Sequence, residues 1–292
     1  MSDSNPDLKA LQAFLNDCRQ LVVLSGAGIS TGSGIPTYRD AEGAWRANEP
    51  IKHQEFINSH ERRQRYWARS MRGWPGVRDA RPNGAHRALA LLESRGYIDT
   101  IITQNVDRLH QRAGSSRVID LHGRLDKVIC LDCRESQSRE SVQRRLERDN
   151  PGASATGFET RPDGDSDVPD HVVSGFRTPD CERCGGTLMP DVVFFGGTVP
   201  KQRVEDCMAA VDRSQGLLVV GSSLTVYSGF RFCRRAHDKG KPIALINPGK
   251  SRADELAALR LASPCEPVLS DLIAGLAVAE NPKVANAESL AG

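Results

Sequence analysis

A glycine-rich turn that directly follows a short apolar run is the sequence feature that most constrains how this chain folds. The run Leu21 to Ser25 reads as a buried parallel strand, and Gly26 and Gly28 follow it at once. Glycine lets a backbone turn sharply and approach a ligand closely, and a helix that starts after such a turn offers free N–H groups to a phosphate. The usual dinucleotide fingerprint has a third glycine where this chain has Thr31, so a standard Rossmann turn is not predicted.

The residues after this turn predict a loop over a ligand rather than a plain helix. The segment 33–40 is rich in turn formers and carries Tyr38 next to Arg39. The alternative is an ordinary strand–turn–helix corner, which we favour if only the glycine turn is considered.

Composition excludes several classes of protein. The chain has 292 residues, 39% of them hydrophobic, and its 39 Lys and Arg against 37 Asp and Glu leave a net charge of +2, which predicts no specific nucleic-acid partner. No apolar run has the length of a membrane span, and the N-terminus resembles neither a signal nor a transit peptide, so we expect a cytoplasmic protein without a membrane partner. Eight cysteines in a reducing compartment indicate metal binding or chemistry rather than disulfides.

Alternating strand and helix patterns predict the α/β class, with a Rossmann-like, doubly wound parallel sheet and a smaller helical and zinc-binding module inserted in it. We expect strands at 97–103, 117–121, 189–197, 217–220 and 242–246, and helices at 7–18, 82–94, 201–214, 228–239 and 269–276. The predicted domains are a Rossmann-like nucleotide-binding domain (1–40, 81–126 and 188–276), a small helical and zinc-binding domain (41–80 and 127–187) and a disordered tail (277–292).

The segment 41–80 predicts short helices that form a lid. It holds all three tryptophans, including Trp45, together with interleaved arginines. Tyr66 and Arg69 share a helix face and are able to offer a hydroxyl and a guanidinium to a carboxylate. From spacing alone we favour a surface helix with a packed tyrosine and a solvated arginine.

Polar residues follow the predicted strands where an open α/β sheet binds its ligands. Gln104, Asn105 and Asp107 follow the strand at 97–103 and suit a ribose or an amide, although Asn105 or Asp107 also suits a helix N-cap. His122 follows the next strand, and a catalytic base and a structural histidine are about equally favoured. Further along the chain, the strand-end residues Gly221, Ser222, Ser223, Asn247 and Gly249 suit phosphate or ribose, and Cys265 is expected in a loop.

Two C-x-x-C pairs predict a tetrahedral zinc site. The pairs are Cys130 with Cys133 and Cys181 with Cys184. A redox dithiol is the alternative, but neither pair has the βαβ context that it requires. Between the pairs we expect a charged helix near 138–148 and a mobile loop at 151–170.

These motifs together resemble the sirtuins, a family of NAD-dependent protein-lysine deacylases. In order, they are GAGIS, SGIP, YR, TQNVD, LHG, the two C-x-x-C pairs, PDVVFFG, GSSLTVYSG and INPG, and they span most of the chain from Gly26 to about Cys265. Details such as YWAR, GWP and the long insert between the cysteine pairs resemble the class II, mitochondrial-type sirtuins, and the absence of a transit segment favours a bacterial member.

The resemblance implies a role for each matching position. NAD would be a consumed co-substrate and one Zn²⁺ would be structural. His122 would be the general base, with Asn105 as a second catalytic residue. The residues implied for NAD are Gly26, Ala27, Gly28, Ser30, Thr31, Thr37, Tyr38, Arg39, Trp45, Gln104, Asn105, Asp107, Gly221, Ser222, Ser223, Asn247, Gly249 and Cys265. Those implied for the substrate are Tyr66, Arg69, Val193, Phe194, Phe195 and Gly196, the strand 193–196 clamping an extended peptide together with the loop after Ser223.

The implied reaction removes an acyl group from protein lysine and gives nicotinamide, O-acyl-ADP-ribose and free lysine. The expected partner is an acylated-lysine protein or peptide, and we expect a monomer. Protein ADP-ribosyl transfer and a non-catalytic NAD-binding scaffold are the alternatives. Gly32 and Gly197 depart from residues frequent in the family, so the acyl preference among acetyl, lipoyl, longer and acidic groups stays open.

Overall fold

The larger part of the molecule is built on a six-stranded parallel sheet. The computed structural model describes residues 6–38, 40, 50–153, 164, 166 and 168–280, with side chains to residue 276. The strands lie in the order β3-β2-β1-β7-β8-β9, and each pairs in parallel with its neighbours. They are β1 (Leu21–Ser25), β2 (Ile98–Thr103), β3 (Val118–Asp120), β7 (Leu217–Val220), β8 (Ile243–Ile246) and β9 (Leu259–Leu261). The predicted doubly wound α/β sheet is therefore confirmed.

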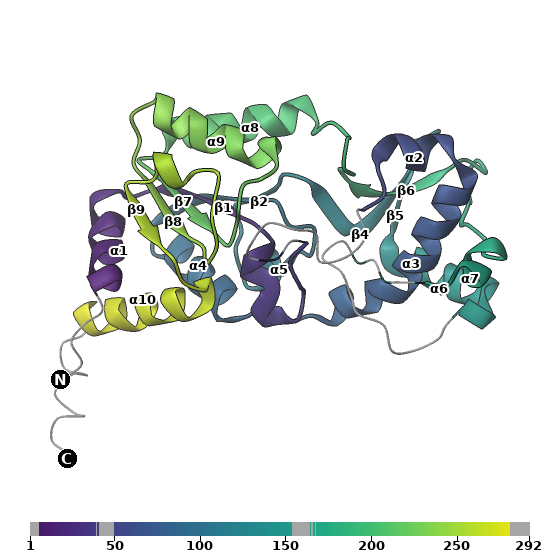
Figure 1. Ribbon diagram of the computed structural model, residues 1–292, viewed down its shortest axis with the longest axis horizontal. Coiled ribbons are helices and arrows are strands. Elements are labelled where there is room, and N and C mark those ends of the chain that lie inside the picture. Colours follow the sequence, from purple (N-terminus) through teal and green to yellow (C-terminus); the bar gives the residue numbers. More distant parts are fainter. Residues whose placement is uncertain are drawn as a thin grey trace, which may run out of the picture.

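Helices cover both faces of this sheet, which explains why its central strands are apolar throughout (Figure 1). On one face α1 (Pro6–Asp17), α4 (Gly84–Ser94) and α10 (Cys265–Glu280) pack in one hydrophobic cluster. On the other face α8 (Lys201–Arg213) and α9 (Tyr227–Asp238) pack in a second cluster. Three short helices lie at strand ends: η1 (Ala27–Ser33), α5 (Leu109–Arg112) and η3 (Asp254–Leu256).

A smaller module lies beside the sheet and has its own core (Figure 1). Its three-stranded antiparallel sheet has the order β5-β4-β6. The strands are β4 (Gly123–Cys130), β5 (Ser136–Ser138) and β6 (Leu188–Val192), and the helices are α2 (His53–Asn58), α3 (His60–Asp79), α6 (Arg139–Asp149), η2 (Pro151–Ala153) and α7 (Asp170–Ser174).

Several predicted elements differ from the observed ones. In its described part the lid segment holds the short helix α2, as predicted, but also one helix of 20 residues, α3. Ser59 caps α3 by accepting a hydrogen bond from the Arg62 N–H, and α3 runs through Pro75. The strand predicted at 189–197 ends at Val192 and pairs with β4 in the small sheet, because the chain turns at Gly196, where φ is +73°.

The C-terminal region also differs from its prediction. Cys265 is the first residue of α10 rather than part of a loop, and α10 continues to Glu280, four residues beyond the predicted end. The strands β4, β5 and β9 were not predicted, and β5 and β9 have only three residues each. The division into domains stays a prediction, as does the tail, which lies outside the described residues after Glu280.

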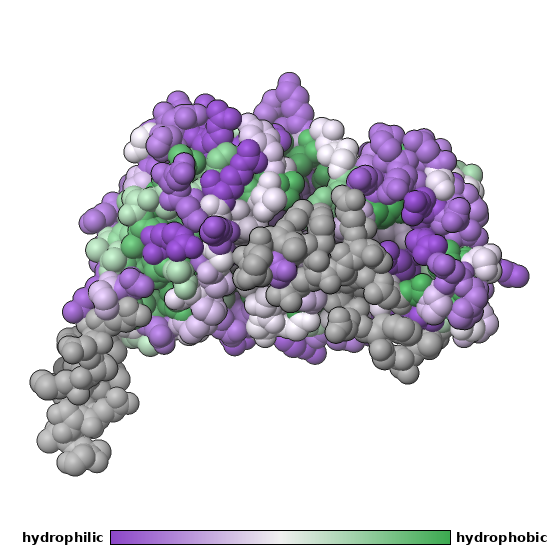
Figure 2. Space-filling model, viewed as in Figure 1, coloured by the Kyte–Doolittle hydropathy of each residue, from purple (hydrophilic) through white to green (hydrophobic). Residues whose placement is uncertain are grey.

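The visible face of the molecule is largely hydrophilic, with hydrophobic residues reaching it over the larger part and near the junction with the small module (Figure 2). Within the described ranges, no helix combines the length and apolar character that crossing a membrane requires.

Candidate active site

Two glycine-containing turns, which we call the glycine corners, meet at the point of the sheet where the strand order reverses. The first is at Gly26 and Gly28 after β1, and the second is at Gly221 after β7. From β1 the chain proceeds to β2 on one side, while β7 and β8 lie on the other side, and ligands of open α/β sheets bind at such a point. The Gly28 N–H donates to the Gly221 carbonyl at 2.9 Å. A Cβ atom on Gly28 would lie 2.8 Å from that oxygen, and one on Gly221, at φ +61°, would lie 2.4 Å from the Ile29 nitrogen. These glycines are therefore required for contact between two backbones.

A hydrogen-bonded cluster of side chains lies at the carboxyl ends of β1 and β2. The Ser30 hydroxyl donates to Asp107 Oδ2 at 2.7 Å and accepts from Asn105 Nδ2 at 3.0 Å. Asp107 Oδ1 accepts the Leu109 N–H at 2.9 Å and so supports the start of α5, but the N-cap residue is Arg108, not Asn105 or Asp107 as the capping alternative had predicted. Burial raises the pKa of Asp107 above its usual range. The cluster thus holds the Asn105 amide in a fixed position at the edge of the sheet.

Gln104 joins this cluster to the second glycine corner. Its Nε2 donates to the Ser222 hydroxyl at 2.9 Å and lies 3.3 Å from the Ser25 carbonyl. Residues predicted from two distant parts of the sequence are therefore within hydrogen-bond distance of each other.

His122 lies at the same edge and has both ring nitrogens engaged. Nδ1 lies 3.0 Å from the Gln104 carbonyl, which only accepts, so Nδ1 carries the proton. Nε2 is then the free base and accepts from the Ser228 hydroxyl at 2.8 Å. Burial lowers the pKa of His122 to about 4, with the positive charges of Arg203 and Arg231 acting in the same direction. At neutral pH the imidazole is therefore uncharged and able to take a proton at Nε2.

Ser228 was given no role in the sequence analysis. It lies in α9 within the GSSLTVYSG motif, far along the chain from His122, and no spacing rule connects the two. Its place at the start of a helix that follows a strand-end glycine corner was the available signal.

The remaining residues predicted for NAD lie around the second corner and η1. Cys265 Sγ lies 3.5 Å from the Gly28 carbonyl, which brings the start of α10 to the glycine turn. Asn247 Nδ2 donates to the Gly249 carbonyl at 2.9 Å, and the Ser223 hydroxyl pairs with Thr225 at 3.0 Å. Ala27, Thr31 and Thr37 lie in or just after η1, whereas Arg39 and Trp45 fall outside the described residues.

The residues predicted for the peptide begin beside His122. The Val193 N–H donates to the His122 carbonyl at 2.8 Å. The Phe195 ring makes an edge contact with Tyr38, at 5.8 Å between centroids, and Gly196 is exposed. The Phe194 side chain is buried in the core of the module against Phe56 and Tyr66, so only its backbone is available to a substrate.

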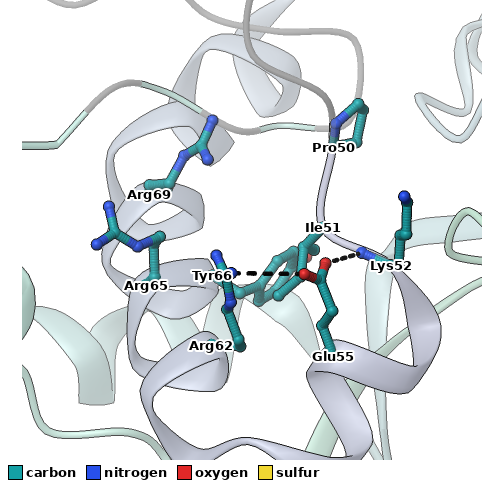
Figure 3. Close-up of a pocket in the computed structure, with 8 residues that line it drawn as sticks. All are labelled: Pro50, Ile51, Lys52, Glu55, Arg62, Arg65, Tyr66 and Arg69. Atoms are coloured by element: carbon teal, nitrogen blue, oxygen red, sulfur yellow. Dashed lines mark hydrogen bonds and ion pairs between the residues drawn. The ribbon is translucent and has the colours of Figure 1, made fainter.

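Tyr66 and Arg69 line a cavity of about 140 Å³ between α2 and α3 (Figure 3). The Tyr66 ring is buried, as expected for a packed tyrosine, and Arg69 Nε donates to the Ser166 carbonyl at 3.1 Å. The full lining is Pro50, Ile51, Lys52, Glu55, Arg62, Arg65, Tyr66 and Arg69. Four of these side chains are cationic and one is anionic, so the cavity favours a negatively charged group.

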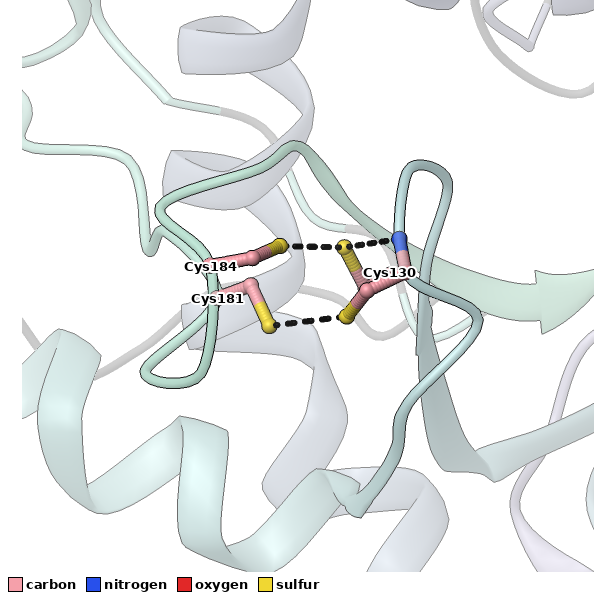
Figure 4. A group of neighbouring side chains, drawn as sticks. Cys130, Cys181 and Cys184 are labelled. Atoms are coloured by element: carbon pink, nitrogen blue, oxygen red, sulfur yellow. Dashed lines mark hydrogen bonds between the residues drawn. The ribbon is translucent and has the colours of Figure 1, made fainter.

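The four cysteines of the C-x-x-C pairs come together at the end of the small sheet (Figure 4). Their sulfurs all lie within 4.8 Å of one another, and two contacts measure 3.6 and 3.7 Å. A tetrahedral zinc with bonds of about 2.3 Å separates its sulfurs by about 3.8 Å, whereas a disulfide requires about 2.05 Å. The four thiols are therefore positioned to hold a structural metal ion.

Two buried histidines lie behind the amide cluster. The His86 and His110 rings meet edge to face at 5.0 Å between centroids, and His110 Nε2 lies 2.8 Å from the Ser25 hydroxyl. Ser25 in turn donates to Thr103, whose hydroxyl accepts the Asn105 N–H at 3.1 Å. Burial lowers the pKa of His86 to about 3 and that of His110 to about 4.

Comparison with known proteins gives one consistent result. Residues 26–228 match the model of the Sir2 family. The chain is 50% identical over 273 residues to an NAD-dependent protein deacetylase of Bordetella bronchiseptica, covering 94% of this chain and all of the relative. It is 51% identical over 263 residues to an NAD-dependent protein deacetylase of Xanthomonas campestris pv. campestris, covering 90% of each. A solved structure described as Sir2 with a p53 peptide and NAD+ superposes with a TM-score of 0.75 at 28% identity, covering 93% of this chain and 99% of that one.

Proposed function

The chain belongs to the Sir2 family, and we propose that it is an NAD-dependent protein-lysine deacylase. One observation carries this proposal most directly: an uncharged His122 contacts the Gln104 carbonyl through Nδ1, and the Gln104 side chain contacts Ser222 of the second glycine corner, which leaves Nε2 as the base beside Ser228. The relatives are named for the same activity.

NAD would bind across the two glycine corners. Gly26, Gly28 and Ser30 would lie against the pyrophosphate, because glycine lets the backbone approach a ligand closely. Asn105 and Asp107 would hold the nicotinamide end, and Gly221, Ser222, Ser223, Asn247, Gly249 and Cys265 would surround the adenosine end. Asn105 is held by Ser30 before any ligand arrives, so its amide is preorganised.

His122 supplies the proton transfer. Bound NAD would supply an electrophilic ribose carbon at which the acyl-lysine carbonyl oxygen displaces nicotinamide; the acyl carbon would then bond to a ribose hydroxyl oxygen, and one water would be consumed as its bond to the lysine nitrogen breaks, giving O-acyl-ADP-ribose and free lysine. Nε2 of His122 would take a proton from a ribose hydroxyl, which would replace Ser228 as its hydrogen-bond partner. The Gln104 carbonyl holds the Nδ1 proton and so stabilises the imidazolium that results.

The acylated protein would lie as an extended strand between the two parts of the molecule. The segment Val193 to Gly196 would offer its backbone on one side and the loop after Ser223 on the other, as in strand addition. The cationic cavity around Arg69 is compatible with an acidic acyl group, and Tyr66 would close it. We also propose that the thiol site holds one zinc ion, and that the protein is a cytoplasmic monomer.

Mass spectrometry on a panel of acylated lysine peptides tests this function. We expect NAD-dependent loss of acetyl, lipoyl, longer or succinyl groups, and the fastest reaction identifies the acyl class. A mass gain of ADP-ribose on protein, without acyl loss, would assign the chain to the ADP-ribosyltransferases instead. NAD binding with neither reaction on any peptide would support the scaffold alternative.

A further inference from the structure

Two arginines on α9 and one in the loop after β8 have no acidic partner among the residues that the structure describes. In the part of the chain that the structure describes, Arg231, Arg234 and Arg252 make no ion pair with a carboxylate. Arginines close to them do: Arg235 binds Asp212 at 2.7 Å and Arg260 binds Asp254 at 2.9 Å. The cluster of three is thus left as net positive charge.

Aromatic rings hold these arginines together. The Arg252 guanidinium lies 4.4 Å from the centre of the Phe230 ring and 5.8 Å from that of Tyr227. Arg231 lies 5.4 Å from the Tyr227 ring, whose hydroxyl is 3.4 Å from Arg234. Such contacts order the cations without neutralising them. We call these five residues the arginine–tyrosine patch: Tyr227, Phe230, Arg231, Arg234 and Arg252.

The patch is exposed and includes an apolar component. Tyr227 is 48% exposed and its neighbour Val226 is 45% exposed, and among the described residues these are the large hydrophobic side chains that face solvent. Hydrophobic and cationic groups at one place fit a partner that offers both carboxylates and apolar contact.

The patch lies next to the catalytic base. Ser228, which follows Tyr227 directly, contacts Nε2 of His122 at 2.8 Å. The Arg252 N–H donates to the Ser223 carbonyl at 2.9 Å, which ties the patch to the second glycine corner. A protein whose lysine reaches His122 therefore passes within reach of these arginines.

We propose that the arginine–tyrosine patch is a docking surface for acidic residues that flank the acylated lysine of the protein substrate. This specificity rests on the proposed deacylase function and names the sequence class that the same active site prefers. Glutamates or aspartates near the lysine meet Arg234 and Arg252 at the rim, where an exposed ion pair contributes modestly and weakens with salt. The apolar stems of these residues pack on Tyr227.

Paired peptides test this docking directly. The test peptides contain an acetyl-lysine with two glutamates on each side. The matched control peptides contain glutamine in place of each glutamate. For the wild-type protein at low salt we expect kcat/KM to be roughly 3- to 30-fold higher with glutamate, since each exposed ion pair contributes up to several-fold. The double variant Arg234→Glu/Arg252→Glu should lose or reverse this ratio while keeping its rate on the glutamine peptide within about threefold.

The control variant is Arg144→Glu, which reverses the charge of one exposed arginine on α6 in the small module. It should leave the ratio of kcat/KM between the glutamate and glutamine peptides unchanged. Equal kcat/KM for the two peptides in the wild type, or an unchanged ratio in the double variant, would overturn the docking proposal. So would binding of a short duplex DNA by the patch without any discrimination between peptides. In each case, deacetylation of the glutamine peptide shows that the proposed deacylase function itself holds. If none of the peptides reacts, the deacylase function is contradicted instead of the docking proposal.

Discussion

At the scale of the residue, the chemistry depends on which nitrogen of His122 is free. The Gln104 carbonyl fixes the proton on Nδ1, and Ser228 then occupies Nε2. A hydroxyl that donates to a neutral imidazole stabilises the neutral form, so Ser228 helps to keep the pKa of His122 low. Ser228 is therefore a positioning residue for the base rather than a reacting group.

Replacement of Ser228 tests this role. We expect Ser228→Ala to move the acidic limb of the pH profile of kcat/KM to higher pH, because the neutral imidazole loses a donor, while the maximal rate falls less than about tenfold. Ser228→Thr retains the hydroxyl and should restore the wild-type profile. A profile that does not move in Ser228→Ala would contradict the role.

At the scale of the element, the site depends on the contact between two strand-end turns. Gly221 has a left-handed conformation and no room for a side chain against η1. Gly221→Ala should lower the free energy of unfolding by about 2 kcal/mol or more, since it adds backbone strain to overpacking. NAD affinity should fall with it, as measured by calorimetry alongside urea unfolding.

The matched control for this variant is Gly175→Ala, where φ is −100° and no atom lies within 4 Å of the added carbon. It should change stability by less than about 0.5 kcal/mol. If Gly221→Ala and Gly175→Ala had the same free energy of unfolding, the close contact between the turns at Gly28 and Gly221 would not be needed for stability.

The metal site is the second feature at this scale. Because the thiols tie the ends of β4 and β6, we expect one zinc ion per folded chain, and removal of the ion by a chelator should lower the melting temperature of the protein. Cys184→Ala should abolish zinc content, measured by elemental analysis. Cys18→Ala, outside the cluster, should retain it, and folded wild-type protein without metal would contradict the assignment.

The elements also show what the sequence predicts and where it stops. The strands β1, β7 and β8 were predictable because buried parallel strands are almost entirely apolar and end at glycine or polar residues, and β2 was predictable from its isoleucines although it also contains Asp99 and Thr100. The meeting of Gln104 with Ser222 follows from the parallel sheet alone. The contacts of Ser228 with His122 and of Cys265 with Gly28 were out of reach, because they depend on how helices pack over long separations in sequence.

Gly32 and Gly197, which depart from residues frequent in the family, lie where neighbouring atoms leave no room for a side chain. A Cβ atom on Gly32 would lie 2.0 Å from the Glu266 carboxylate, which accepts the Gly84 N–H at 2.8 Å. One on Gly197 would lie 2.9 Å from the Phe194 carbonyl. In this chain the side chains frequent elsewhere in the family would require local rearrangement.

At the scale of the whole molecule, the buried His86 and His110 and the partly buried His122 make folding sensitive to acid. The pKa values of His86, His110 and His122 are lowered to about 3, 4 and 4 by burial, so the unfolded chain binds more protons below pH 6.5. Their stabilising contribution is present above pH 6.5 and is lost as the pH falls toward 4.

Urea unfolding at pH 7.5 and pH 5 measures this contribution. We expect each of these histidines to account for about 1–2 kcal/mol of the loss in stability between the two values. His110→Gln should therefore show a smaller loss, and His237→Gln, at an exposed position on α9, should show the wild-type loss. An equal loss in both variants would contradict the buried neutral state of His110.

The central claim is that a neutral imidazole at the junction of the two glycine corners drives an acyl transfer that consumes NAD. The most direct measurement follows NAD, nicotinamide and an acetyl-lysine peptide together in the wild type and in His122→Ala, with circular dichroism to confirm folding. We expect one nicotinamide and one O-acetyl-ADP-ribose per acetyl group lost in the wild type, and at least about a 100-fold slower reaction in folded His122→Ala. Deacetylation without NAD consumption, or at the wild-type rate in His122→Ala, would contradict this claim.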